Sequence, residues 1–234
     1  MTIKDFRART SNLFLGSKPI GAVELLVAIL ILVGGLVGII PFSSTPFVLL
    51  FGWLMMWLRG VGWRNLGLRR PTSWRNTLLL GVAVGVGYQY FSLYVLEPLI
   101  ARVTGSLPDV SQFAPLVGNT FFLFLSLIVS WTLAAFGEEL VFRGYLMNRV
   151  ADLVGSNRSG WLISLIVVSI LFGITHLYQG MSGIIVMTLH GLLLGALYLA
   201  TGRNLWVPII AHGLNDTVGF TLIYLGKYPG LSPQ

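Results

Sequence analysis

Two neighbouring carboxylates stand in a stretch of the sequence that is otherwise strongly apolar. Glu138 and Glu139 follow the apolar run 121–136, and Arg143 comes one helical turn later. Residues four apart share one face of a helix, so the spacing predicts an ion pair between Glu139 and Arg143. Glu138 is rotated by about 100° from its neighbour and has no obvious partner nearby in the sequence. One carboxylate is therefore expected to stay ionised, and the other to be free to exchange a proton.

Histidines stand in two other apolar segments. His176 follows Phe172 by one helical turn, and His212 is followed at three and four positions by Asn215 and Asp216. Either of these two polar side chains can lie beside the His212 imidazole in a cavity. Ionisable side chains are costly inside a membrane and usually mark function. We therefore interpret these residues and the carboxylate pair as one polar site inside a helical bundle.

The third histidine, His190, lies in the middle of an apolar segment with no acidic residue near it in the sequence. We expect it mainly to pack or to form a hydrogen bond. The alternative is an accessory role at the polar site.

These residue types permit the hydrolysis of a peptide bond. A carboxylate and a histidine can hold a water molecule between them, with the carboxylate as general base. A second histidine with an adjacent amide or acid can stabilise the oxyanion that forms. The same donors, Glu138, His176 and His212, could instead bind zinc. The sequence has no H-E-x-x-H helix, and we favour a reaction without a cofactor, with zinc as the alternative.

Composition excludes an ordinary soluble protein. Of the 234 residues, 55% are apolar and 10% are charged, and the mean hydropathy is +0.83, whereas soluble chains carry about 25% charged residues. The absence of cysteine excludes disulfides, iron-sulfur clusters and thiolate zinc sites. The net charge of +7 comes from scattered basic residues without interleaved aromatic residues, so we expect no nucleic-acid partner.

Apolar segments of membrane-spanning length recur along the whole chain. A helix needs about 20 residues to cross a hydrocarbon core of about 30 Å. The sequence predicts an all-α, polytopic membrane bundle of about seven helices, within a range of six to eight, at 20–40, 43–58, 77–99, 119–137, 160–178, 182–200 and 205–225. The second segment is short and is bracketed by Pro41 and Pro46, so a re-entrant segment is its alternative.

The basic residues predict the orientation of the chain in its membrane. With the N-terminus in the cytoplasm, thirteen of the fifteen fall on the cytoplasmic side, Arg143 among them, and only Arg102 and Lys227 fall outside. Basic residues concentrate on the cytoplasmic side of membrane proteins. We therefore expect an integral multi-pass protein of the plasma or inner membrane, with its N-terminus inside and its C-terminus outside.

The predicted spans divide the chain into four parts. These are a cytoplasmic basic tail at 1–19, N-terminal transmembrane helices and loops at 20–118, a catalytic transmembrane core at 119–225 and a C-terminal tail at 226–234. Three glycine pairs, Gly34 with Gly38, Gly81 with Gly85 and Gly191 with Gly195, are candidates for close contact between helices.

Three motifs in a fixed order carry a resemblance to a known family. Glu138-Glu139-x-x-x-Arg143, Phe172-x-x-x-His176 and His212-x-x-x-Asp216 resemble the signature motifs of the CPBP family, the CAAX-protease and bacteriocin-processing intramembrane proteases, also called abortive-infection-like. The resemblance extends over residues 120–217. It implies an endopeptidase in the membrane that cleaves a membrane-embedded or lipidated peptide or protein.

The resemblance also implies a role for each motif residue. Glu138 would be the general base on a water that it shares with His176, and His212 with Asp216 would form the oxyanion site. Glu139 and Arg143 would support the site. The family often has asparagine where this chain has Asp216, and an ionised acid cannot donate a hydrogen bond, so Asp216 is protonated or Asn215 contributes.

The predicted spans contain one geometric difficulty. They put Glu138 at the inner end of one span and His176 at the outer end of the next, about 15 to 20 Å apart in depth. A tilted helix, a break near Gly137 or Gly173, or a different span boundary would bring the two together.

A non-catalytic binding or immunity protein and a small transporter remain as alternative functions. Transporters often show paired repeats, and none is visible here. CAAX processing requires a host that prenylates proteins, which the sequence does not reveal. The substrate and the oligomeric state are equally open.

Overall fold

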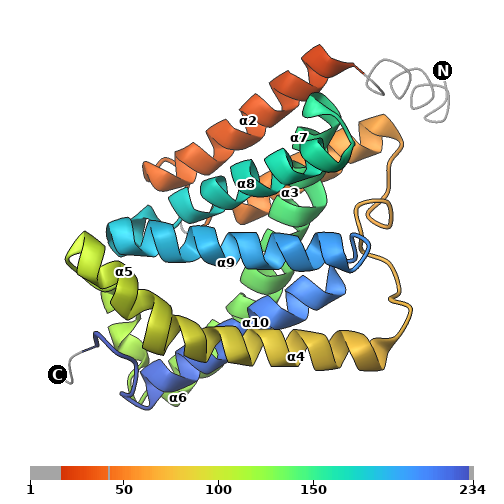
Figure 1. Cartoon of the computed structure of the whole chain (residues 1–234). Helices are drawn as coiled ribbons and strands as arrows, with labels where there is room; N and C mark the ends of the chain where they lie inside the picture. The colour runs from red at the N-terminus through yellow and green to blue at the C-terminus, as the bar shows by residue number, and fades with distance from the viewer. Residues whose placement is uncertain (1–16, 42, 232–234) are drawn as a thin grey trace.

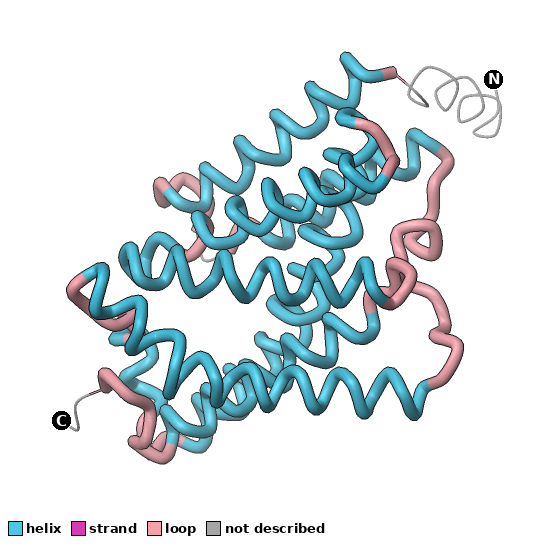
Figure 2. The backbone as a smooth tube through the Cα atoms, in the orientation of Figure 1, coloured by secondary structure: helices cyan, strands magenta, loops and turns pink. Residues whose placement is uncertain are grey.

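Helices make up all the regular structure of the described part of the chain. The computed structural model describes residues 17–41 and 43–231, so most of the predicted tail at 1–19 lies outside the described residues. The predicted all-α fold is confirmed for these ranges (Figure 2). The elements are α2 (Lys18–Leu36), α3 (Thr45–Arg59), α4 (Trp74–Phe91), η1 (Ser92–Leu96), α5 (Glu97–Thr104), η2 (Ser111–Leu116), α6 (Thr120–Val129), η3 (Ser130–Leu146), α7 (Met147–Val154), α8 (Arg158–Ile174), η4 (Leu177–Gln179), α9 (Gly180–Ala200) and α10 (Trp206–Tyr224).

The helices form a bundle that one long helix crosses. In Figure 1, α2, α8, α9 and α4 follow one another from top to bottom, and the chain from α6 through η3 to α7 runs behind them. The helix η3 contacts α3, α8 and α10, and α10 also packs along α4. Because η3 carries both carboxylates of the first motif, this central position brings them into contact with the helices of the other two.

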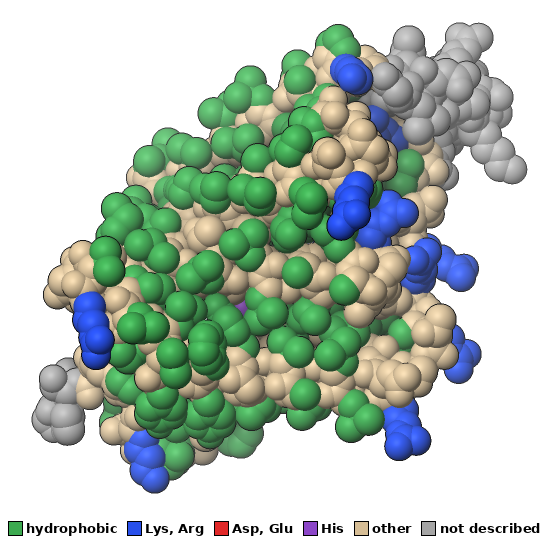
Figure 3. Space-filling view, in the orientation of Figure 1, with side chains coloured by type: hydrophobic (Ala, Val, Ile, Leu, Met, Phe, Trp, Pro, Cys, Tyr) green, Lys and Arg blue, Asp and Glu red, His purple; other side chains and the backbone are tan. Residues whose placement is uncertain are grey.

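The outer surface of the bundle is suited to lipid. Large apolar side chains such as Leu30, Leu79, Phe124 and Ile166 are exposed, and Figure 3 shows hydrophobic side chains over most of the visible face with Lys and Arg at its ends. Exposed apolar area of this extent marks an interaction with a membrane or a partner. The chain is therefore an integral membrane protein.

Four helices of the described part of the chain are long and apolar enough to cross a membrane. They are Lys18–Leu36, Trp74–Thr104, Thr120–Val154 and Leu177–Ala200, and two shorter apolar helices are Thr45–Arg59 and Arg158–Ile174. The predicted seventh span forms the helix α10, whose hydropathy is lowered by the polar site residues His212, Asn215 and Asp216. The total of about seven crossings stays a prediction.

The predicted end of the fourth span at 137 is wrong. The helix begins at Thr120 and continues without a break to Val154, and its central part, η3, has the wider turns of a π-helix. No proline interrupts it, and Gly137 packs closely against α3, where a Cβ would lie 3.1 Å from Thr45 Cγ2. Glu138 and Glu139 consequently lie well inside a long helix and not at its end.

The predicted fifth span, 160–178, is too long at its end. The helix α8 ends at Ile174, and His176 lies in the turn before α9. Two side chains end the helix, because Thr175 Oγ1 donates to the Phe172 carbonyl oxygen at 2.7 Å and His176 Nδ1 lies 2.9 Å from the same oxygen.

Two of the three predicted glycine pairs are contact points between helices. A Cβ at Gly81 would lie 2.6 Å from Ile210 Cγ2, and one at Gly191 would lie 3.1 Å from Ser169 Cα. The pair Gly34 and Gly38 is different, because Gly38 has φ +75° beyond the end of α2, and a Cβ there would meet no other atom within 4 Å. Its role is to adopt the left-handed conformation that ends the helix.

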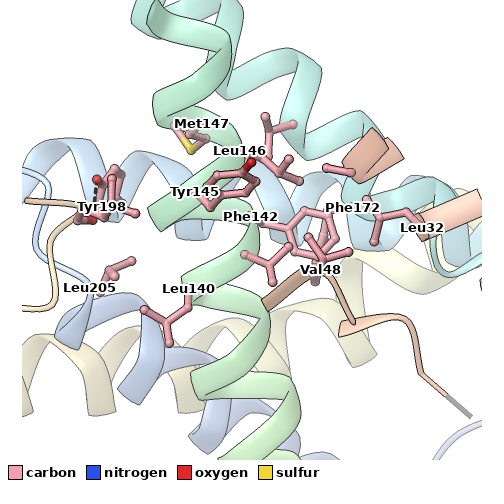
Figure 4. Packing of buried hydrophobic residues seen from close by; sticks show 14 of the residues in the cluster. Leu32, Val48, Leu140, Phe142, Tyr145, Leu146, Met147, Phe172, Tyr198 and Leu205 are labelled. Atoms are coloured by element: carbon pink, nitrogen blue, oxygen red, sulfur yellow. Dashed lines mark hydrogen bonds between the residues drawn. The ribbon is translucent and has the colours of Figure 1, made fainter. Parts of the chain in front are cut away.

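The buried apolar core lies beside the motif residues. Phe142 and Phe172 meet edge to face at a ring distance of 5.0 Å, and Figure 4 shows them next to Val48 and Leu32. Tyr145 and Leu146 extend this core along η3. A close-packed core holds side chains in fixed rotamers, so η3, α8 and α3 are held together directly behind the polar residues.

Candidate active site

A buried ion pair fixes the second carboxylate of the first motif. Arg143 Nη1 donates to Glu139 Oε1 at 2.7 Å, and neither side chain is exposed by more than 2%. Arg143 Nη2 also donates to the Gly191 carbonyl oxygen at 3.1 Å, and the guanidinium lies 4.7 Å from the centre of the Phe172 ring. The predicted pair between Glu139 and Arg143 is confirmed, and it links η3 to α8 and α9.

The same carboxylate orients the histidine of the third motif. His212 Nδ1 lies 2.9 Å from Glu139 Oε1, so an Nδ1–H would donate to the carboxylate. On the other side of the ring, Nε2 lies 3.7 Å from Asp216 Oδ2. His212 is thus held between two acids, one from η3 and one from its own helix. An imidazole bonded at one nitrogen has a defined tautomer and orientation.

Asp216 accepts a hydrogen bond from a residue that the motifs do not contain. Ser130 Oγ donates to Asp216 Oδ2 at 2.7 Å. Ser130 lies eight residues before Glu138, about two helical turns. It is therefore a polar residue on the same face of an apolar run, and this feature of the sequence could have identified it as a site residue. Asn215 is buried and, like Asp216, lines the adjoining cavity.

The histidine of the second motif is fixed by its own chain. Its Nδ1 faces the Phe172 carbonyl oxygen at 2.9 Å, and its ring lies 4.8 Å from the Phe172 ring. An Nδ1–H bonded to that carbonyl leaves Nε2 without its proton and able to accept a hydrogen bond. The predicted proximity of Phe172 and His176 is confirmed, although the two stand on a helix end and the following turn.

Two cavities meet at this site. The larger, about 690 Å³, is lined by Glu138, His176, His212, Asn215 and Asp216 among others. The smaller, about 470 Å³, lies toward α2 and α3 and is lined on that side by Ser43, Ser44 and Thr45. Three residues line both cavities, namely Glu138, His176 and Tyr178.

Glu138 and His176 therefore line a common wall of the two cavities, and the helix end that led to the expected depth separation is absent. The expectation depended on a helix end at 137, whereas the helix continues to Val154. Unlike Glu139, which is fully buried, Glu138 is partly exposed. It accepts no hydrogen bond from the residues that the structure describes, so its carboxylate is open to the cavities.

Arg143, which the charge count places on the cytoplasmic side, is paired inside the bundle. Its side chain is 2% exposed and lies at the core of the site. A charge count along the sequence cannot distinguish a basic residue that is paired inside the bundle from one at the membrane surface.

His190 lies closer to the site than its sequence context indicates. It lines the larger cavity, its ring stacks on Tyr88 at 5.1 Å, and it meets the His212 ring edge to face at 5.4 Å. His190 packs, as expected, but it packs against a site residue.

Tyr178, which also lines both cavities, belongs to none of the three motifs, and the sequence did not identify it as a site residue.

The residues expected as ligands in a zinc mechanism do not form a metal site in the described structure. No group of three or more His, Asp or Glu side chains within residues 17–41 and 43–231 is arranged to hold a metal ion. One ring nitrogen of His212 faces Glu139, and one of His176 faces a backbone carbonyl. In each histidine this contact engages Nδ1 and leaves Nε2 as the ring nitrogen available to a ligand.

Comparison with known families identifies the part of the chain that carries the site. Residues 120–218 match the model of the Rce1-like family, described as type II CAAX prenyl endopeptidase Rce1-like. A comparison with curated proteins found no match, and neither did a comparison with solved structures. The matched segment contains all three motifs. Residues 120–218 are thus similar to an Rce1-like type II CAAX prenyl endopeptidase domain, which is consistent with a protease of the CPBP family.

Proposed function

We propose that this protein is an intramembrane endopeptidase in which Glu138 activates a water molecule for attack on a peptide carbonyl. The observation that carries the proposal is the common wall of the two cavities, where Glu138 and His176 stand together. A general base must be open to water and within reach of the substrate. Of the two motif carboxylates, Glu138 meets this requirement, whereas Glu139 is engaged by Arg143 and His212.

The proposed reaction uses the two histidines differently. Glu138 takes a proton from the water, whose position is shared with His176 Nε2, and the resulting hydroxide attacks the carbonyl carbon. In this proposal His212 stands between the carboxylates of Glu139 and Asp216 as an imidazolium, protonated at both ring nitrogens. Its Nε2–H and the Asn215 amide donate hydrogen bonds to the oxyanion, and such donors make the largest contribution in many acyl-transfer enzymes. Glu138 then returns the proton to the leaving amine.

Asp216 acts in this proposal as an acceptor that orients His212. It receives the hydrogen bond of Ser130 and lies 3.7 Å from His212 Nε2. An acid in this position differs from the asparagine common in the family, and the neighbouring amide of Asn215 supplies the second donor.

The proposed substrate is a membrane-embedded or lipidated peptide or protein. The larger cavity has a mostly apolar lining, with Phe113, Leu125 and Phe220 among its residues, and no Lys or Arg in the part of its wall that the structure describes. A chain segment that carries a free carboxylate would find no cation there. We therefore favour an internal peptide bond near an apolar or lipid-bearing group over a bond next to a free C-terminus.

We further propose a metal-independent, glutamate-type mechanism in a plasma or inner membrane. The carboxylate of Glu138, which lines both cavities, can activate water as a general base without a metal ion. The basic residues agree with an N-terminus inside and a C-terminus outside. Lys18, Arg59 and Arg158 stand at helix ends on one side of the bundle. Arg102 lies in α5, beyond the C-terminal end of α4.

The test is the isosteric change Glu138→Gln. Membrane proteomes of cells that carry the intact protein and the variant are compared for substrates that accumulate uncut, and a substrate found in this way is incubated with each purified protein. We expect cleavage to fall by about 10²- to 10⁴-fold while the melting temperature is kept.

The matched control is Asp109→Asn, an equivalent change at a carboxylate in the loop after α5, which accepts a hydrogen bond from the Ser111 N–H at 2.9 Å. This variant is expected to cleave at the normal rate. Undiminished cleavage by a folded Glu138→Gln protein would disprove the proposed role.

A further inference from the structure

A separate cavity with cationic walls lies at the end of the bundle where α2 begins. It has a volume of about 410 Å³, and it lies among α2, the end of α3 and α7. Its polar lining consists of Ser17, Lys18, Arg59, Arg149, Asp152 and Ser156. None of these residues lines the two cavities of the candidate active site.

Positive charge exceeds negative charge in this cavity. Three cationic side chains line it, whereas Asp152 is its one acidic lining residue in the described structure. Asp152 Oδ2 lies 2.8 Å from Arg149 Nη2, and its side chain is half exposed. Glu24, behind the wall, pairs with Arg59. One positive charge remains in excess when both acids are counted, and Lys18 supplies it.

Arg149 carries a donor that is not satisfied within the described structure. Its Nε is buried and has no hydrogen-bond partner there, although the same guanidinium binds Asp152 through Nη2. A buried donor without an acceptor is destabilising. The Arg149 guanidinium therefore has hydrogen-bonding capacity that Asp152 does not use, and it lines the cavity.

The first turn of α2 adds to the positive potential. Ser17, Lys18 and Gly21 line the cavity, no acidic residue stands in this turn, and the helix has 19 residues. The N-terminus of a helix carries partial positive charge, which favours a phosphate nearby. Figure 3 shows Lys and Arg gathered at this end of the molecule, next to exposed apolar side chains.

We propose that this cavity binds a phosphate-bearing anion, with an anionic phospholipid headgroup as its source in the membrane. A basic pocket between transmembrane helices near the membrane surface is suited to such a headgroup, and exposed Leu26 and Leu30 of α2 are available to its acyl chains. Because α7 continues the helix that carries Glu138, the ligand would brace α2 and α3 against the catalytic helix.

The experiment is native mass spectrometry of the full-length protein in detergent with phosphatidylglycerol or phosphatidylcholine added. We expect the intact protein to retain phosphatidylglycerol in preference. Each lost surface cation weakens binding of anionic lipid by about fivefold, so Lys18→Gln with Arg149→Gln should weaken it by on the order of 30-fold. Both proteins keep Lys4, Arg7 and Arg9, so a difference between them reports on the cavity.

Arg102→Gln, a loss of charge at the other end of the bundle, is the matched control and should leave the preference unchanged. If the double variant does not fold, Lys18→Gln alone tests the proposal, because Lys18 is exposed. The expected loss of affinity for phosphatidylglycerol is then about fivefold. Equal retention of the two lipids by the intact protein would overturn the proposal, as would an equal loss in the Arg102→Gln variant.

A second arm identifies the source of the phosphate. Inorganic phosphate is titrated against thermal unfolding of the lipid-free protein. Stabilisation of the intact protein but not of the double variant would support free phosphate as a ligand of the cavity, and lipid retention without such stabilisation would support the headgroup. The absence of both effects would overturn the proposal.

Discussion

Two buried glutamates each pair with an arginine, but they differ in how many of their oxygens are bonded. Glu24 of α2 contacts η3 through Tyr145, and Glu139 lies on η3. Both oxygens of Glu24 are occupied: Oε1 accepts from Tyr145 Oη at 2.7 Å, and Oε2 accepts from Arg59 Nε at 3.0 Å. Glu139 receives Arg143 and His212 on Oε1 alone, and its buried Oε2 has no partner in the described structure.

This difference indicates a structural role for the network of Glu24 and a functional role for the network of Glu139. A buried network whose members are all satisfied stabilises one packing arrangement, and that of Glu24 joins α2, α3 and η3 at some distance from the active-site cavities. The network of Glu139 extends to His212, which lines the larger cavity. The incomplete satisfaction of Glu139 beside a cavity is typical of functional sites. We therefore expect substitutions in the two networks to affect different properties.

Glu139→Gln is expected to have the largest combined effect. It leaves the buried Arg143 without its counter-charge, which costs about 3 to 5 kcal/mol in stability, and it removes the charged acceptor that orients His212. Cleavage by the remaining folded protein should fall by about 100-fold or more. Thermal unfolding in detergent and cleavage of an identified substrate measure the two losses, and a variant with normal cleavage would show that His212 does not need this partner.

Glu24→Gln should match Glu139→Gln in stability but not in activity. It removes the charge that compensates buried Arg59, at a similar cost of about 3 to 5 kcal/mol. Cleavage per folded molecule, measured below the melting temperature, should stay within about twofold of normal because the cavities are unchanged. A large loss of cleavage in a fully folded Glu24→Gln protein would show that the two networks are coupled, and would contradict their separate roles.

Ser130→Ala is expected to have a smaller effect confined to the site. It removes the hydrogen bond to Asp216, worth about 1 kcal/mol, so cleavage should fall by about fivefold with little change in melting temperature. Thr132→Ala is the matched control, since Thr132 Oγ1 bonds to the Ile128 carbonyl oxygen within its own helix. An equal loss in the control would assign the effect to the helix and not to Asp216.

Chelation is expected to have no effect. Because the reaction proposed for Glu138 and His176 uses no metal, incubation of the purified protein with a strong chelator should leave cleavage unchanged. Loss of cleavage that added zinc restores would favour the metal-dependent alternative. The Glu24→Gln variant serves as the control for nonspecific sensitivity to the chelator.

The short-range contacts of the site could be predicted from the sequence, and the long-range contacts could not. The pair of Glu139 with Arg143 follows from a spacing of four on a helix, and the contact of Phe172 with His176 from the same spacing at a helix end. The bond between Glu139 and His212 joins residues 73 apart, and that of Ser130 with Asp216 joins residues 86 apart. Such contacts depend on how helices cross, which local spacing does not determine.

The boundaries of the helices also depend on tertiary contacts that local spacing does not determine. Apolar length predicts that a segment is helical and membrane-embedded, but the fourth span continues past its polar residues to Val154. A pair of charges in a sequence normally indicates the end of a span. Here the charges are compensated inside the protein, because α8 and α10 supply partners for them, so the helix continues.

By itself, the sequence determined the class of the protein, because composition and apolar segment length reflect the solvent in which the chain must fold. It also determined which residues to consider, because three motifs stand out where charge is rare. The spacing also indicated that Glu139, and not Glu138, pairs with Arg143. Only the tertiary structure decided that Glu139 also holds His212 and that Glu138 lines the two cavities with His176, because the packing of η3 against α8 and α10 sets both.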